Sequence, residues 1–147
     1  GLAVHKVFEQ VEWADDTTPA RLALFRETMP EAVDEVARCL ANKALAKRLA
    51  KPEGDVHLWR ERAFDLVVEN EFISGVFDRV HVYANRAEII DFKSDRVSDE
   101  ASLKQAAEKY GPQMATYRQA LAKLTGLAES AIGCSLLFTH PRRVIEV

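Results

Sequence analysis

Two aspartates and a lysine have the types and spacing that suit chemistry on a phosphate. Asp78 lies in the run G-V-F-D-R-V, and Asp91 and Lys93 lie in the later run I-I-D-F-K-S. Hard divalent cations such as Mg²⁺ prefer carboxylate oxygens and keep positions open for water and phosphate. The main-chain carbonyl of Phe92 would add a ligand, and Lys93 would orient or deprotonate the attacking water. These are the parts for metal-assisted hydrolysis of a phosphodiester bond.

Both aspartates fall on predicted strands. Residues 75–94 read as two strands joined by a tight turn at Asn85 and Arg86. Because side chains alternate along a strand, Asp91 and Lys93 are expected to point the same way. Charges among Val, Ile and Phe are costly to bury without partners or a metal. A buried ion-pair cluster is therefore the alternative to a metal-dependent active site.

The hydrophobic pattern predicts an α/β fold with a central mixed sheet flanked by helices. Helical periodicity covers residues 2–12, a short segment after Thr18-Pro19, and one long segment from Pro30 to Lys51. Three strand-like runs at 58–69, 72–83 and 87–94 predict an antiparallel meander. Helices at 101–109 and from Gly111 to Gly126 follow, and then a buried strand at 131–138 and an edge strand at 144–147. A helical crossover would add the buried strand in parallel.

Composition limits the class of protein. A chain of 147 residues with 48% hydrophobic residues suits a single domain spanning 1–147. A net charge of -3 argues against binding nucleic acid by bulk electrostatics alone, although a local basic groove remains open. No apolar run approaches the roughly 20 residues that cross a bilayer. The two cysteines, Cys39 and Cys134, cannot form a four-cysteine cluster and are predicted to be reduced thiols in a cytosolic protein.

Five motifs in order resemble the hallmarks of the PD-(D/E)xK nucleases, and specifically of their RecB-like branch. The chain begins with G-L-A-V-H, which resembles a G-x-x-x-H motif whose histidine binds metal. The second motif is an acidic strand position, here Glu61, and the third is the G-V-F-D run with Asp78. The fourth is the D-F-K run with Asp91 and Lys93, and the fifth is a Q-x-x-x-Y helix with Gln113 and Tyr117. Each motif alone is weak, but their order across the chain is specific.

The resemblance implies a restriction-endonuclease-like fold and a set of roles. His5, Asp78, Asp91 and the Phe92 carbonyl would bind Mg²⁺, with Mn²⁺ as a possible substitute and no iron–sulfur cluster. Lys93 would act at the attacking water, beside the two aspartates. Glu61 would join them as a further catalytic carboxylate.

Two of these residues have competing structural explanations in the sequence. His5 by itself reads as a half-buried histidine paired with Glu9 one helical turn away, and only the resemblance makes it a metal ligand. Glu61 would also serve in a plain salt bridge with Arg60 or Arg62.

The second half of the chain supplies candidate substrate contacts. Gln113 and Tyr117 would share one face of a helix, where they either pack it against the sheet or, as the resemblance implies, line the DNA path or orient Lys93 and the scissile phosphate. Tyr110 and Arg118 are candidates for base stacking and phosphate contact.

The resemblance implies a metal-dependent deoxyribonuclease, acting exonucleolytically on single-stranded DNA ends in repair and recombination. DNA and a helicase motor of the same assembly would be its partners, in a bacterial-type cytoplasm and without a membrane. The start inside a helix, without an initiator Met, suggests a domain cut from a larger protein. The resemblance, together with the lack of a four-cysteine cluster, implies the C-terminal nuclease domain of a RecB- or AddA-type helicase-nuclease. The alternative is an inactive nuclease-like module that binds DNA or holds a repair complex together.

Overall fold

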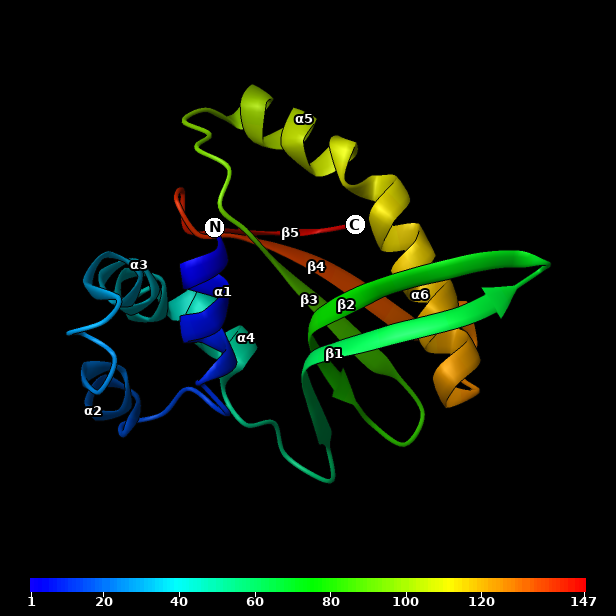
Figure 1. Ribbon diagram of the computed structural model, residues 1–147, viewed down its shortest axis with the longest axis horizontal. Helices are drawn as coiled ribbons and strands as arrows, with labels where there is room; N and C mark the ends of the chain where they lie inside the picture. Colours follow the sequence, from blue (N-terminus) through cyan, green and yellow to red (C-terminus); the bar gives the residue numbers. More distant parts are fainter.

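A mixed five-stranded sheet forms the centre of the computed structural model, which describes residues 1–147 (Figure 1). The strands lie in chain order: β1 (His57–Val68), β2 (Glu71–Val82), β3 (Ala87–Lys93), β4 (Ile132–Phe138) and β5 (Arg143–Glu146). All neighbours pair antiparallel except β3 and β4, which are parallel. The predicted meander, helical crossover and edge strand are therefore confirmed.

Six α-helices cover the two faces of the sheet. They are α1 (Leu2–Glu9), α2 (Thr18–Ala23), α3 (Pro30–Ala41), α4 (Lys43–Leu49), α5 (Glu100–Lys109) and α6 (Gly111–Thr125), and a 3₁₀ turn, η1 (Glu129–Ala131), precedes β4. None of them combines the length and the apolar character needed to cross a membrane.

The prediction of one long helix from Pro30 to Lys51 is wrong, because the chain breaks at Asn42. This residue takes an extended conformation, with ψ at 122°, and its side chain accepts hydrogen bonds from the N–H groups of Ala44 and Leu45. Asparagine is a favoured N-cap, so it ends α3 and begins α4. The first helix is also shorter than predicted and ends at Glu9.

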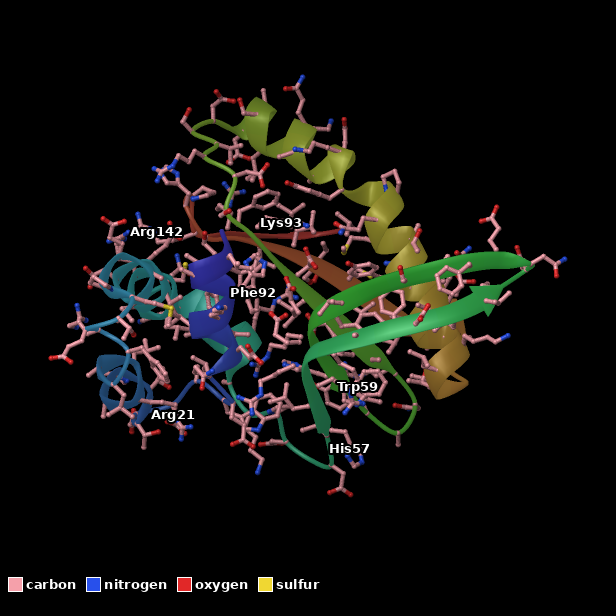
Figure 2. The ribbon with its side chains drawn as sticks, viewed as in Figure 1. Arg21, His57, Trp59, Phe92, Lys93 and Arg142 are labelled. Carbon is pink, nitrogen blue, oxygen red and sulfur yellow. The ribbon has the colours of Figure 1, made fainter.

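Two hydrophobic cores lie on opposite faces of the sheet. Ile89 packs into the core that α5 and α6 share, whereas Ile90 and Phe92 pack with α1, α3 and α4. The Phe92 ring stacks on Phe8 of α1, with centroids 4.1 Å apart. Figure 2 shows Phe92 and Lys93 in the middle of the molecule, between the N-terminal helices and α5–α6. The alternation along β3 thus presents its successive residues to different layers.

The β1–β2 hairpin is longer than the strand beside it. β2 pairs with β3 only from Arg79 to Val82. The earlier part of β2, from Glu71 to Phe77, pairs with β1 alone and forms a two-stranded ribbon (Figure 1). Gly75 lies on this ribbon, where a Cβ atom would come within 2.8 Å of the Phe64 ring and 3.0 Å of Tyr117. Glycine therefore allows α6 to pack closely against the ribbon.

Candidate active site

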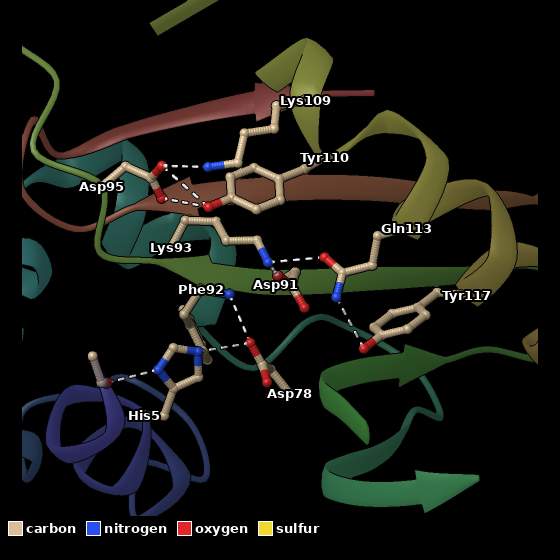
Figure 3. Close-up of polar contacts among 11 residues, drawn as sticks. His5, Asp78, Asp91, Phe92, Lys93, Asp95, Lys109, Tyr110, Gln113 and Tyr117 are labelled. Atoms are coloured by element: carbon tan, nitrogen blue, oxygen red, sulfur yellow. Dashed lines mark hydrogen bonds and ion pairs between the residues drawn. The ribbon is translucent and has the colours of Figure 1, made fainter. Parts of the chain in front are cut away.

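Asp78 lies where β2 and β3 separate, one residue beyond their last pair. Its Oδ2 accepts a hydrogen bond of 2.9 Å from the main-chain N–H of Phe92 and lies 3.2 Å from His5 Nε2. His5 in turn has its Nδ1 2.9 Å from the Gly1 carbonyl oxygen. The first helix and the central strands are thus joined at this carboxylate (Figure 3).

Asp91 and Lys93 point to the same side of β3, as the alternation predicts. Lys93 Nζ lies 2.7 Å from Asp91 Oδ2 and donates to Gln113 Oε1 at 3.0 Å. The Gln113 amide reaches the Tyr117 hydroxyl at 3.3 Å, one turn along α6. Figure 3 shows this chain of contacts running from β3 to α6. The Asp91 side chain is only 5% exposed and that of Lys93 14%, so their ion pair is largely shielded from water.

Burial and neighbouring charges change how these groups titrate. The hydrogen bond with Asp78 raises the pKa of His5 to about 9, against the opposing effect of burial. Burial raises the pKa of Asp91 above its usual range, and the Asp78 charge adds to this, although Lys93 acts in the opposite direction. At neutral pH a protonated His5 therefore partners Asp78.

Glu61 lies opposite Asp78 in the register of the hairpin, but regular pairing is interrupted there and its φ is 44°. Burial raises the pKa of Glu61, and the Asp78 charge does so further. The alternative salt bridge is not formed, because Arg60 donates to a main-chain carbonyl of α1 and Arg62 lies 4.2 Å above the Trp59 ring. The structure therefore places Glu61 across the hairpin from Asp78, in a backbone conformation that is strained for a non-glycine residue.

The residues at this site suit a divalent cation by chemistry. Carboxylate and carbonyl oxygens are the ligands that suit Mg²⁺ and Mn²⁺, whereas an imidazole nitrogen is a softer donor that suits later transition metals better. Asp91 Oδ2 is buried, and Lys93 Nζ is its partner in the folded chain, at 2.7 Å. No three His, Cys, Asp or Glu side chains lie close enough together to hold an ion. His5 approaches from the α1 side and Asp91 from the α6 side, and ion pairs engage both aspartates.

Tyr110 and Asp95 form a second polar contact beside Lys93. The Tyr110 hydroxyl donates to Asp95 Oδ1 at 2.8 Å, and its ring centroid lies 4.0 Å from Lys93 Nζ. Burial and the bond to Asp95 raise the pKa of Tyr110 to about 12, so the hydroxyl remains a donor. Asp95 was missed in the sequence, where its only signal is an acidic residue two positions after Lys93.

Arg118 is not brought to the site. Its guanidinium donates to the main-chain carbonyls of Ile132 and Val147, each at 2.9 Å. It therefore ties α6 to the start of β4 and to the last residue of the chain. Its predicted role in phosphate contact finds no support in this geometry.

Arg79, the residue after Asp78, is a supporting residue that sequence reasoning missed. Its guanidinium is buried and donates to the main-chain carbonyls of Val11, at 2.7 Å, and Glu12, while its Nε donates to His81 at 2.8 Å. The segment after α1 is thereby anchored to β2, which keeps the helix carrying His5 against the sheet. The available signal was an arginine within an otherwise apolar strand.

Comparison with known proteins identifies the family of the chain. A family model described as the PD-(D/E)XK nuclease superfamily matches residues 1–146.

Two bacterial relatives each bear the name of one subunit of an ATP-dependent helicase/nuclease. The protein from Limosilactobacillus fermentum is 34% identical over 78 residues, which cover 51% of this chain and 6% of the relative. The one from Streptococcus equi subsp. zooepidemicus is 26% identical over 140 residues, 87% of this chain and 11% of the relative. The chain thus spans only a small part of these relatives. With the family model matched over almost its whole length, this chain belongs to the PD-(D/E)XK nuclease superfamily.

Proposed function

We propose that this chain is a Mg²⁺-dependent deoxyribonuclease that hydrolyses phosphodiester bonds, acting as an exonuclease on single-stranded DNA ends. One observation carries the proposal: Asp78 and Asp91 flank the point where β2 and β3 separate, and Lys93 Nζ lies 2.7 Å from Asp91 Oδ2. Two carboxylates and a lysine, placed together where two strands separate, are groups that metal-assisted phosphodiester hydrolysis uses. Membership of a nuclease superfamily supports the same reaction.

In this proposal His5, Asp78, Asp91 and the Phe92 carbonyl hold the ion, which is Mg²⁺ or, as a substitute, Mn²⁺. When bound, the ion supplies Lewis-acid stabilisation of the phosphate and lowers the pKa of water. His5 must first release its proton, and its bond to the Gly1 carbonyl then fixes the ring orientation. Asp78 is already fixed by the Phe92 N–H.

Lys93 orients the attacking water and offsets negative charge as the phosphate is attacked. Gln113, itself bonded to Tyr117, holds the ammonium from the α6 side. Glu61, which lies opposite Asp78 on β1, supplies a third carboxylate.

The substrate and partner are inferred from the relatives. Both carry helicase and nuclease in their names, and this chain matches a minor share of each. We infer that a helicase motor supplies single-stranded ends to the nuclease domain during DNA repair and recombination. Such a role would place the protein in the cytoplasm, beside chromosomal DNA.

Cleavage of labelled DNA tests the proposal. The chain is incubated with 5′-labelled, 3′-labelled and circular single-stranded DNA and with duplex DNA, in Mg²⁺, Mn²⁺ or EDTA. We expect metal-dependent shortening of linear single strands and loss of activity in Asp91→Asn. Asp34→Asn is the matched control, because Asp34 pairs with Arg26 on an exposed helix face. No cleavage at high protein concentration would overturn the proposal that the chain is a nuclease. Cleavage of circular DNA would overturn the proposal that it acts only as an exonuclease.

A further inference from the structure

We propose that Asp95 and Tyr110 are positioning residues that hold the Lys93 ammonium at the reacting phosphate, and that Tyr110 does not serve as a base-stacking surface. The inference rests on the proposed function, since it assigns how the lysine of that same site is aimed. Neither residue has a role in the ligand set described above.

Three groups from different elements surround Lys93 Nζ. Asp91 Oδ2 lies at 2.7 Å on the same strand, Gln113 Oε1 lies at 3.0 Å on α6, and the Tyr110 ring centroid lies at 4.0 Å (Figure 3). A cation within about 6 Å of an aromatic centroid is attracted by the negative face of the ring. A lysine side chain has four rotatable bonds, so contacts on several sides are needed to fix its end.

Asp95 fixes the ring that contacts the lysine. Both carboxylate oxygens lie near the Tyr110 hydroxyl, at 2.8 and 3.1 Å. Tyr110 occupies the junction between α5 and α6, where its half-buried ring packs against the core of that face and its hydroxyl is held by Asp95. A hydrogen bond to an anion also polarises the phenol, which makes the ring face more attractive to a cation. Asp95 lies two residues after the end of β3, so one segment of chain supplies both the lysine and the anchor of the ring that contacts it.

The same contacts leave Tyr110 unsuited to stacking. Lys93 already lies over its ring, and Lys109 Nζ lies 4.9 Å from the centroid and 3.8 Å from Asp95 Oδ2. A nucleotide base would have to displace a cation to reach that face. The hydroxyl is likewise committed to Asp95 and not to a phosphate.

Lysine NMR tests the position of Lys93 independently of cleavage. The protein is labelled with ¹³Cε-lysine, and the Lys93 signal is assigned from the spectrum of Lys93→Met. We expect the aromatic ring to shift the Lys93 ε-protons upfield. Tyr110→Leu should abolish this shift, while Tyr110→Phe and Asp95→Asn should reduce it. Tyr83→Leu is the matched control, because Tyr83 also stacks on a cation, Arg86, but in the β2–β3 turn. An unchanged Lys93 signal in Tyr110→Leu would overturn the proposal.

Kinetics separate positioning from DNA binding. We expect Tyr110→Leu to lower kcat about tenfold and Tyr110→Phe about threefold, with KM unchanged, since losing a cation–π contact is a small energetic change at a critical group. DNA affinity, measured by fluorescence anisotropy, should be equal in Lys93→Met and Lys93→Met/Tyr110→Leu. Weaker affinity in the double variant would instead make Tyr110 a DNA contact and overturn the proposal. If the unsubstituted chain did not cleave DNA, only the proposed nuclease function would be contradicted. The position of Lys93 against the Tyr110 ring is tested separately, by the NMR experiment.

Discussion

The main-chain N–H of Phe92 donates a 2.9 Å hydrogen bond to the side chain of Asp78, where a strand partner would otherwise accept it. Regular pairing of β2 with β3 ends at Arg79 and Ile90, which lie one residue from Asp78 and two residues from Phe92. The carboxylate thus replaces the missing backbone acceptor and fixes the two strands at the point where they separate. Only Oδ2 is used, for this bond and for His5, so Oδ1 has no hydrogen bond from the protein and remains available to a ligand.

Replacing Lys93 with methionine should separate metal binding from catalysis. The variant keeps the bulk of the side chain and all four proposed ligands, but it removes the ammonium beside Asp91. We expect cleavage to fall about 100- to 10,000-fold, the usual range for a lost proton-transfer group. Mn²⁺ binding, followed by electron paramagnetic resonance, should persist. Equal cleavage by Lys93→Met would mean that the lysine has been given the wrong role.

Replacing Arg79 with methionine should destabilise the fold. The change leaves the buried carbonyl of Val11 and the partly buried carbonyl of Glu12 without donors, and an unsatisfied buried acceptor costs about 1–3 kcal/mol. We expect the free energy of unfolding, from urea titration, to fall by about 3 kcal/mol. Arg60→Met is the control, since exposed Arg60 bonds a single carbonyl, that of Glu9. Similar losses in the two variants would refute the anchoring role of Arg79.

His81 should make the protein less stable in mild acid. Burial, with the charge of Arg79, lowers the pKa of His81 to about 3 in the folded chain, against an ordinary value of 6.5. Between these values the unfolded chain binds a proton that the folded chain does not, so stability falls as the pH drops from 6.5 towards 3. At pH 5 the loss from this one group is about 2 kcal/mol.

The comparison with His81→Asn isolates that effect, because asparagine still offers an acceptor to Arg79 but does not titrate. Urea titrations from pH 4 to 7 should give a shallower pH dependence in the variant. Parallel curves for the two proteins would show that His81 does not keep its neutral form on folding.

Metal affinity should rise with pH through the titration of His5. Its folded pKa is about 9, so binding at neutral pH has to release a proton from the imidazole that pairs with Asp78. We expect the apparent Mn²⁺ affinity, from calorimetry, to increase about tenfold per pH unit between 6.5 and 8.5. In His5→Asn the dependence should be nearly flat and the binding weaker. A pH-independent affinity in the unsubstituted chain would remove His5 from the ligand set.

Periodicity in the sequence was sufficient to predict the strands that carry the reactive groups. Alternation alone placed Asp91 and Lys93 on one side of β3, where they form an ion pair. The helix ending at Gly126, followed by a buried run, predicted the parallel crossover to β4. The break at Asn42 also had a local signal, since asparagine favours an N-cap, but continuous hydrophobic periodicity concealed it.

Contacts between distant segments depended on the tertiary structure. The sequence by itself determined which residues share a face of a strand or helix, because that follows from the geometry of the backbone. It did not determine that His5 meets Asp78, that Arg79 anchors the segment after α1, or that Asp95 holds the ring of Tyr110 beside Lys93. Those contacts exist because α1 and α6 pack on opposite faces of the sheet and approach β3 from both sides. Only the folded arrangement of the layers decides which side chains meet there.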